Sequence, residues 1–288
     1  MSRVTNSTGR KPAARRPTRV PPPTLRFERE IWRTGAGLLA AVDEVGRGAL
    51  AGPVSVGVVL LDARTKPAPF GVADSKLLTA QARQRLVPRI KRWAADSAVG
   101  HAEAAEIDRI GVIAALRLAA ERAVSQLSRR PDWVLLDGNH DYLTRREQPT
   151  LFDEAGTADV AEEAGWRCTV PVWTLIKGDM RCSSIAAASV LAKTERDAML
   201  IELAEQYPLY GFAENKAYAS PQHLAALVEH GPCAIHRCSW NLPGLAGREG
   251  GAGISMAEAL QMPDVIASLT GAELMGDDGD MISVGLDR

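Results

Sequence analysis

The stretch Ala-Ala-Val-Asp-Glu-Val-Gly-Arg-Gly-Ala-Leu-Ala-Gly-Pro-Val, at residues 40–54, decides the fold of this chain. An apolar run that begins at Leu38 predicts a buried strand, and this strand ends in two adjacent carboxylates, Asp43 and Glu44. Burying two charges at the end of a strand is costly unless a partner or a metal ion compensates them. The pair therefore indicates either a solvated strand end or a functional site.

The residues after the carboxylates make the stretch more specific. Gly46-Arg47-Gly48 places a cationic side chain between two residues that let a backbone approach a ligand closely. Gly52-Pro53 then turns the chain into a second apolar run, residues 54–62, which we expect to pair with the first strand.

Composition sets the outer limits of the interpretation. The 288 residues are 46% hydrophobic, enough for one substantial core or two small ones. The formal net charge of −1 indicates no partner by itself. Residues 1–33 are basic and Pro-rich and predict a disordered tail, either solvated or loosely bound to nucleic acid. Residues 241–288 are Gly-rich and acidic and predict a second flexible tail.

The cysteines and the hydropathy of the chain bear on its location. The four cysteines show no C-x-x-C spacing, and we expect free thiols in a cytoplasmic protein. A zinc site that uses Cys233, His236 and Cys238 has the wrong spacing for a standard site. The sequence has no apolar segment of about 18 residues, so neither a signal peptide nor a membrane span is predicted.

Strand and helix patterns alternate through residues 34–240, which we expect to form an α/β domain. The expected strands are 37–44, 54–62, 97–103, 133–136 and 170–176, and the expected helices are 80–95, 104–128, 183–206 and 221–230. Residues 139–168 are polar with little periodicity, and they predict an insertion into this domain.

Further carboxylates occur at two positions far along the chain. Asp137 follows a short apolar strand, and Asp197 lies on the helix 183–206. Acids without a His/Cys set suit hard cations such as Mg²⁺ or Mn²⁺, and two such ions about 4 Å apart support phosphodiester hydrolysis. Five cations accompany the acids: Arg47, Lys76, Lys177, Lys193 and Arg237. This is the inventory of a nuclease, although several phosphoryl-transfer classes share it. For Asp197, a solvent-exposed pair with Lys193 is the alternative.

The order of short motifs makes the prediction specific. Asp43-Glu44-Val45-Gly46-Arg47-Gly48 resembles the signature of type 2 ribonucleases H, specifically the bacterial ribonuclease HII family. Further matches occur in the order of that family: Asp74-Ser75-Lys76, Leu136-Asp137-Gly138, Lys177-Gly178-Asp179, Ala187-Ala188-Ser189, Arg196-Asp197, Asn215-Lys216, Tyr218, His223 and His236-Arg237. The resemblance covers residues 34–240. It implies a ribonuclease H-like fold, with a five-stranded mixed sheet whose strands 1–3 are antiparallel, flanking helices and a helical C-terminal extension.

The resemblance also implies an activity and a role for each matching residue. It implies a metal-dependent endoribonuclease that cleaves RNA in RNA/DNA hybrids and incises 5′ of single ribonucleotides in duplex DNA, with a metal-activated water as nucleophile. The metal-binding and catalytic residues would be Asp43, Glu44, Asp137 and Asp197, with two Mg²⁺ or Mn²⁺ ions per site. Substrate-binding residues would be Gly46, Arg47, Gly48, Lys76, Lys177, Ser189 and Tyr218. We expect a monomer.

Two local features test this assignment. Side chains alternate along a strand, so Asp43 and Glu44 should point to opposite faces. Both can reach one metal pair only if the strand ends or bulges there, and a flat strand through residue 48 would contradict the mechanism. In addition, Ala217 stands where the family usually has glycine. Because alanine disfavours positive φ, we expect the loop that carries Tyr218 to differ.

Three alternatives remain at this stage. Ribonuclease HIII has a folded N-terminal substrate-binding domain, which the basic and Pro-rich residues 1–33 do not resemble. A catalytically inactive hybrid-binding module is disfavoured because the acids are intact. An integrase-like DNA nuclease is disfavoured by the Gly46-Arg47-Gly48 segment.

Overall fold

The computed structural model describes residues 21–145 and 165–243, and one mixed sheet of five strands lies at its centre. The strands are β1 (Leu38–Val45), β2 (Val54–Asp62), β3 (Asp96–Ala102), β4 (Trp133–Asp137) and β5 (Val172–Leu175). Their order across the sheet is β3-β2-β1-β4-β5. β1, β2 and β3 are antiparallel, whereas β4 pairs parallel with β1 and β5 parallel with β4. The predicted five-stranded mixed sheet is confirmed.

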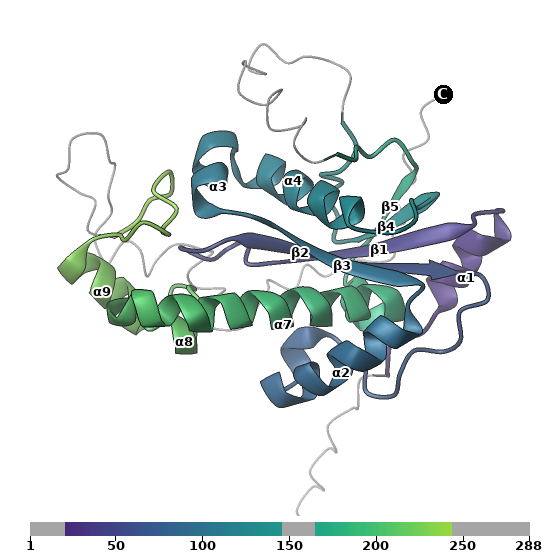
Figure 1. Cartoon of the computed structure of the whole chain (residues 1–288), viewed down its shortest axis with the longest axis horizontal. Helices are drawn as coiled ribbons and strands as arrows, with labels where there is room; N and C mark the ends of the chain where they lie inside the picture. Colours follow the sequence, from purple (N-terminus) through teal and green to yellow (C-terminus); the bar gives the residue numbers. More distant parts are fainter. Residues whose placement is uncertain (1–20, 146–164, 244–288) are drawn as a thin grey trace, which may run out of the picture.

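Helices cover both faces of the sheet (Figure 1). α3 (Ala104–Ile110) and α4 (Val112–Ser125) lie on one face, and α7 (Ser183–Gln206) lies on the other with α2 (Ala80–Trp93) packed beyond it. The remaining helices are α1 (Arg26–Arg33), α6 (Gly178–Arg181), α8 (Phe212–Asn215) and α9 (Pro221–His230), with 3₁₀ turns η1 (Ser75–Leu77) and η2 (Pro208–Tyr210). β1 and β2 are therefore apolar on both faces, which explains their nearly continuous hydrophobic sequence.

α7 lies close against the sheet because a glycine of β2 has no side chain to hold it away. A Cβ atom added to Gly57 would lie 2.3 Å from the carbonyl oxygen of Ala188. Gly57 is also the partner of Asp43 in the β1–β2 ladder. The close approach therefore places the N-terminal part of α7, around Ala188, beside the end of β1.

Two boundaries differ by more than two residues from those that the sequence predicts. The helix expected over 104–128 is divided by Gly111, whose φ of +78° is incompatible with a continuous helix, and α4 ends at Ser125. The folded part of the chain also begins before residue 34. α1 packs Ile31 into the core, and the Glu28 carboxylate accepts a hydrogen bond from the Ser184 N–H at 3.0 Å.

Other predictions fall wholly or partly outside the described residues. These are most of the 1–33 tail, the centre of the 139–168 insertion and the 241–288 tail beyond residue 243. Among the helices of the described ranges, none combines the length and hydropathy needed to span a bilayer.

Candidate active site

The sheet brings Asp43, Glu44 and Asp137 together at the carboxyl ends of two neighbouring strands. β1 and β4 run parallel, and their last paired residues are Val42 and Leu136. The next residue of each strand is an aspartate, so Asp43 and Asp137 lie side by side. This edge of an α/β sheet is where ligands commonly bind.

A fourth acid, Asp179, reaches the same edge from β5. β5 pairs Leu175 with Asp137, and the chain then turns through Lys177 into α6. At this turn the Gly178 N–H donates to Asp137 Oδ1 at 2.6 Å. We call Asp43, Glu44, Asp137 and Asp179 the acid site.

Burial raises the pKa of every carboxyl group in the acid site, and repulsion by neighbouring acids adds to the rise at Asp43, Glu44 and Asp179. At Asp43 burial has the largest effect, followed by the charges of Asp137 and Glu44. Burial and then Asp137 raise the pKa of Glu44 to about 7. The pKa of Asp179 rises to about 7 through burial, then Asp137, then Asp74. Burial also raises the pKa of Asp137. Such clusters of perturbed acids are typical of functional sites.

Asp43 and Glu44 reach the acid site from opposite faces of β1. Asp43 points toward α7, where Ser189 hydrogen-bonds to its carboxylate, and Glu44 points toward Tyr142, whose hydroxyl donates to it at 3.4 Å. The ladder with β2 is regular to its end at Val45, so there is no bulge, and the strand stops there. Because Asp137 stands at the adjacent strand end, its charge acts on both carboxylates.

The structure does not bring Asp197 to the acid site. Its two carboxylate oxygens accept hydrogen bonds from Arg83 at 2.9 Å and Lys193 at 2.7 Å. It also lies eight residues beyond Ser189 on α7, a rise of about 12 Å along the helix. The pairing with Lys193 is present, although Asp197 is buried rather than solvent-exposed. Asp197 is a poor candidate for a metal ligand because two cations already hold it.

The sequence assigns a role only to the lysine of Lys177-Gly178-Asp179, whereas the structure adds Asp179 to the acid site. Like Asp43 and Asp137, Asp179 is an acid that follows an apolar strand, although not directly. The signal was weak because β5 has only four residues and its acid comes four positions after the strand.

The donor set of the acid site fits hard divalent cations. Carboxylate oxygens are the preferred ligands of Mg²⁺ and Mn²⁺, and bound cations would offset the repulsion that raises these pKa values. Over the described ranges, no three His, Cys, Asp or Glu side chains stand close enough together to hold one metal ion as they are placed, around Cys233 and His236 or elsewhere. The four acids of the acid site do interact through their charges.

Two of the three predicted phosphate contacts lie at the rim of the acid site. Lys76 is exposed, and its charge opposes the rise in the pKa of Asp137 and Asp179. Lys177 is also exposed and has a left-handed backbone, with φ of 54°. Ser189 differs because it is buried, and its hydroxyl is shared between Ser75 at 2.8 Å and Asp43. Ser189 therefore supports Asp43 and is not open to a phosphate.

The two glycines of Gly46-Arg47-Gly48 have different surroundings. Gly46 is buried with φ of +83°, and an added Cβ would lie 2.1 Å from Nε of Arg196. The fold therefore requires glycine at this position. Gly48 is exposed, its φ is outside the left-handed range, and an added Cβ would meet nothing within 4 Å. The described fold gives no reason for glycine at residue 48.

The loop that carries Tyr218 keeps its left-handed backbone despite the alanine. Lys216 and Ala217 have φ of 51° and 66°, so the alanine adopts the positive φ that it disfavours. Tertiary contacts hold the loop, since Ala217 O accepts from the Leu50 N–H at 2.8 Å and Lys216 O from Arg196 at 3.0 Å. Tyr218 is half-buried beside Arg196, whose guanidinium carbon lies 5.5 Å from the ring centre.

Two of the cations that the sequence placed near the acids are used elsewhere. Lys193 pairs with Asp197, and Arg237 is fully buried with its guanidinium bonded to backbone carbonyl groups.

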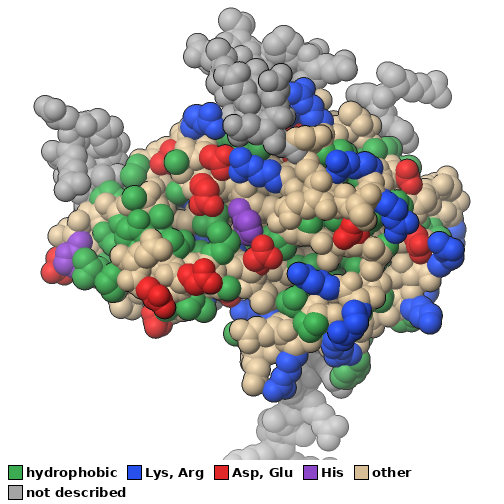
Figure 2. Space-filling view, in the orientation of Figure 1, with side chains coloured by type: hydrophobic (Ala, Val, Ile, Leu, Met, Phe, Trp, Pro, Cys, Tyr) green, Lys and Arg blue, Asp and Glu red, His purple; other side chains and the backbone are tan. Residues whose placement is uncertain are grey.

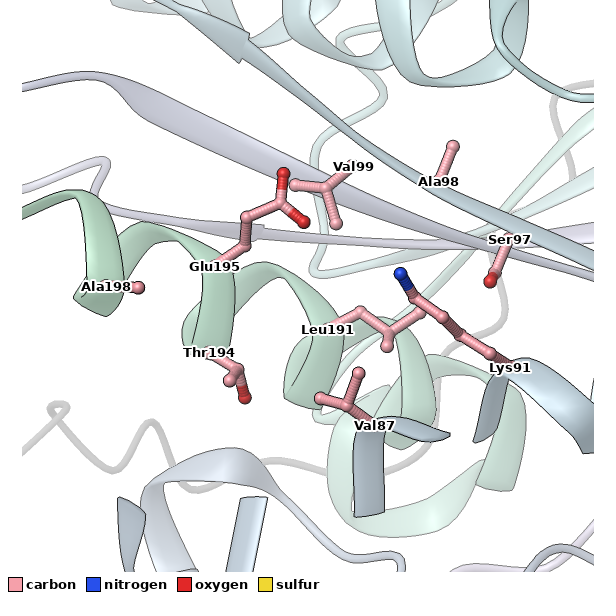
Figure 3. A pocket seen from close by; sticks show the side chains of 9 residues that line it. All are labelled: Val87, Lys91, Ser97, Ala98, Val99, Leu191, Thr194, Glu195 and Ala198. Carbon is pink, nitrogen blue, oxygen red and sulfur yellow. The ribbon is translucent and has the colours of Figure 1, made fainter. Parts of the chain in front are cut away.

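A separate hollow of about 190 Å³ lies between α2, β3 and α7 (Figure 3). Lys91 and Glu195 line it, but no predicted site residue does.

A ribonuclease H-like sheet with acids at the ends of β1 and β4 defines a nuclease of the ribonuclease H class. Comparisons with known proteins agree and are more specific. The family model for ribonuclease HII matches residues 40–242. Ribonuclease HII of Streptomyces coelicolor is 47% identical over 220 residues, which cover 76% of this chain and 84% of that protein. Ribonuclease HII of Thermus thermophilus is 41% identical over 211 residues, which cover 73% and 89%.

A solved structure supports the fold. Ribonuclease H2 from Pyrococcus horikoshii OT3 aligns with a TM-score of 0.51 and 25% identity, over 70% of this chain and 93% of that one. The chain belongs to the ribonuclease HII family, and the prediction from its motifs is confirmed. It is a metal-dependent endonuclease of the ribonuclease H type.

Proposed function

We propose that this ribonuclease H cleaves RNA in RNA/DNA hybrids and also incises 5′ of a single ribonucleotide within duplex DNA, leaving a 3′-hydroxyl. The observation that carries this proposal is the exposed Gly48, which the fold does not require, next to the acid site. A missing side chain without a structural reason indicates close approach by a ligand.

The acid site would hold the metal ions. We propose Asp43, Glu44, Asp137 and, in place of Asp197, Asp179 as the residues that bind two Mg²⁺ or Mn²⁺ ions. When bound, such ions activate a water molecule and neutralise the charge on the cleaved phosphate. The chain itself orients these carboxylates, through Ser189 at Asp43 and the Gly178 N–H at Asp137.

The cationic residues around the acid site would contact the nucleic acid backbone. We assign phosphate contacts to the exposed Lys76 and Lys177, and recognition of the ribose to Gly46, Arg47 and Gly48 with Tyr218 against the following sugar. Figure 2 shows Lys and Arg side chains gathered at the lower right, over α2. This helix contains no acid and exposes Arg85, Arg89, Lys91 and Arg92. Such a surface favours binding to phosphates.

The remaining proposals concern the whole chain. We propose that it acts as a cytoplasmic monomer, with one catalytic domain that extends from α1 to about residue 242 and includes the insertion at 139–168. The residues before and after that domain would be tails with no part in catalysis.

Cleavage of a defined duplex tests the proposed substrate. The protein is incubated with duplex DNA that contains one ribonucleotide, with the all-DNA duplex and with an RNA/DNA hybrid, first in Mg²⁺ and then in Mn²⁺, and the cut is mapped. We expect one incision on the 5′ side of the ribonucleotide and none in the all-DNA duplex. Cleavage of the hybrid without incision at the single ribonucleotide would refute the proposal.

Two variants test the role of residues 46–48. We expect Gly48→Ala to fold with an unchanged Tm, because the space for its methyl group is empty, yet to lower kcat/KM at a single ribonucleotide at least about tenfold by blocking close approach. Arg47→Ala should lower the same rate. Unaltered rates in both variants would remove the segment from substrate recognition.

A further inference from the structure

The guanidinium group of Arg237 lies buried beneath the turn at residues 46–49. Its Nη1 donates to Arg47 O at 2.8 Å, and its Nη2 donates to Gly46 O at 2.7 Å. Nε and Nη2 also donate to Gly52 O, at 3.2 and 3.1 Å. Arg237 is 0% exposed, so it cannot meet a phosphate. Its guanidinium group instead donates hydrogen bonds to two successive peptide groups of the turn.

These hydrogen bonds fix the directions of two backbone donors, the N–H groups of Arg47 and Gly48. In a planar trans peptide the C=O of one residue and the N–H of the next point in opposite directions, and the described part of the chain has no cis peptide. Because the C=O groups of Gly46 and Arg47 point toward Arg237, the N–H groups of Arg47 and Gly48 point away from it.

The side of the turn that these N–H groups face is open. Gly48 is exposed, and apart from its two chain neighbours no atom of the described residues lies within 4 Å of the place where its Cβ would be. Neither the Arg47 N–H nor the Gly48 N–H donates a hydrogen bond to any described residue. Two parallel free donors on an exposed turn suit an acceptor oxygen, and the 2′-hydroxyl oxygen is the acceptor that RNA has and DNA lacks.

We propose that Arg237 is the positioning residue for ribose recognition: it holds the N–H groups of Arg47 and Gly48 toward the 2′-oxygen of the substrate without touching the substrate itself. This inference rests on the proposed function, because it assumes that the turn at 46–49 meets the ribonucleotide.

The anchoring of Arg237 suits this role. Its own N–H donates to Leu50 O at 3.0 Å, and its neighbour His236 forms a β-bridge with Ala51. The ring of Trp240 lies 4.9 Å from the guanidinium carbon. The C-terminal segment is thus fastened to the 46–53 loop at several points, so the guanidinium has a fixed place from which to orient the turn.

Arg196 provides a matched control. It is also a fully buried arginine that donates to carbonyl groups of the same loop, at Pro53 O (2.8 Å) and Ala51 O (3.2 Å). It makes no hydrogen bond to Gly46 O or Arg47 O among the described contacts. Its replacement should therefore weaken the same loop while every hydrogen bond to Gly46 O and Arg47 O stays in place.

The experiment measures binding rather than cleavage. Fluorescence anisotropy in EDTA gives Kd for duplex DNA with one ribonucleotide and for the same duplex without it. For the wild type we expect a preference of about tenfold for the ribonucleotide duplex, the value for two neutral hydrogen bonds. Arg237→Lys keeps the positive charge but loses the planar guanidinium that donates to both Gly46 O and Arg47 O. The ratio of Kd for the all-DNA duplex to Kd for the ribonucleotide duplex should therefore fall toward one, with little change in Kd for the all-DNA duplex. Arg196→Lys should keep the preference.

Three results would overturn the inference: an unchanged preference in Arg237→Lys, an equal loss in Arg196→Lys, or a loss in Arg237→Lys of affinity for both duplexes alike. If Arg237→Lys does not fold, amide NMR of the wild type decides. The Arg47 and Gly48 amide protons should exchange rapidly in the free protein and become protected by the ribonucleotide duplex but not by the all-DNA duplex. Equal protection, or none, refutes the inference.

The outcomes separate this inference from the proposed function. If the wild type neither incises at a single ribonucleotide nor prefers that duplex, the proposed function fails. If the wild type does both and Arg237→Lys retains its preference, only the role of Arg237 fails.

Discussion

The carboxylates of the acid site and the buried guanidinium groups of Arg196 and Arg237, which contact Gly46, are two contrasting regions of the molecule. Both groups are clusters of like charge away from water. Burial raises the pKa of the acids, to about 7 at Glu44. Burial and then the charge of Arg196 lower the pKa of Arg237 to about 9. Neither arginine forms an ion pair within the described ranges.

The difference lies in what compensates the charge. The arginine donors are bonded to backbone carbonyl oxygens, so the protein completes their hydrogen bonding itself. The charges of Arg47 and Lys76, both exposed, act on the acid site, yet its carboxylates stay protonated more readily than usual. A buried charge whose hydrogen-bond partners belong to the protein stabilises the structure. A buried charge without enough such partners indicates a site for a ligand.

The largest expected effect is at the acid site. Asp43→Asn removes a carboxylate that the cations need, and we expect kcat to fall at least about 1,000-fold while binding to a hybrid persists. Cleavage in Mg²⁺ and anisotropy in EDTA measure the two quantities. Normal cleavage by a clean Asp43→Asn preparation would make the acid site irrelevant to catalysis.

Asp179 belongs to the acid site, whereas the charge of Asp197 is already compensated within the protein, so their replacements should have opposite effects on stability and cleavage. Asp179→Asn relieves repulsion, so we expect the Tm to hold or rise while cleavage falls by about 10- to 100-fold. Asp197→Asn leaves Arg83 buried without its partner, so the free energy of unfolding should fall by about 3 kcal/mol with little change in kcat of the folded enzyme. Thermal melts and kinetics on both variants check this. The reverse pattern would restore Asp197 as the metal ligand.

The smallest effect concerns pH. Glu44 and Asp179 have pKa values of about 7 in the folded protein, against 4.5 and 3.8 as ordinary values. Between those limits the folded state binds more protons, so stability falls as pH rises. His223 and His236, whose pKa values are lowered from 6.5, act in the opposite sense below about pH 6.5.

The measurement is therefore made above that range. From pH 6.5 to 8 in EDTA we expect the Tm to decrease by a few degrees, which corresponds to a loss on the order of 1 kcal/mol in the free energy of unfolding. Addition of Mg²⁺ should raise the Tm more at pH 8 than at pH 6.5. The Glu44→Gln variant is the control and should show a shallower decrease. A Tm that rises across this range would contradict the raised pKa values.

The central elements could be predicted because several local signals agreed. The β1–β2 hairpin and α7 have long apolar patterns, and α2 begins after Thr79, whose side chain accepts a capping hydrogen bond from the Ala82 N–H at 3.2 Å. The break at Gly111 was missed because an isolated glycine is tolerated within a helical pattern. At Ala217 local propensity gave the wrong answer, since hydrogen bonds from Leu50 and to Asn215 hold the left-handed backbone.

The acid site was only partly predictable for a different reason. Because Ser189, Lys193 and Asp197 are four residues apart, they share a face of α7, but this spacing does not say how far along the helix the site extends. That distance depends on the register of α7 over the sheet, which no local pattern encodes. Asp179 depends on how the short β5 pairs with β4, which is likewise a property of the assembled sheet.

The position of α7 over the sheet depends on Gly57, and this matters for engineering of the enzyme. Gly57 stands directly across the ladder from Asp43, and its missing side chain lets α7 come close enough for Ser189 to bond the Asp43 carboxylate. Any residue larger than glycine there would push the helix outward and take Ser189 with it. Directed evolution of this nuclease should therefore leave position 57 undiversified, although no side chain exists there to be called functional.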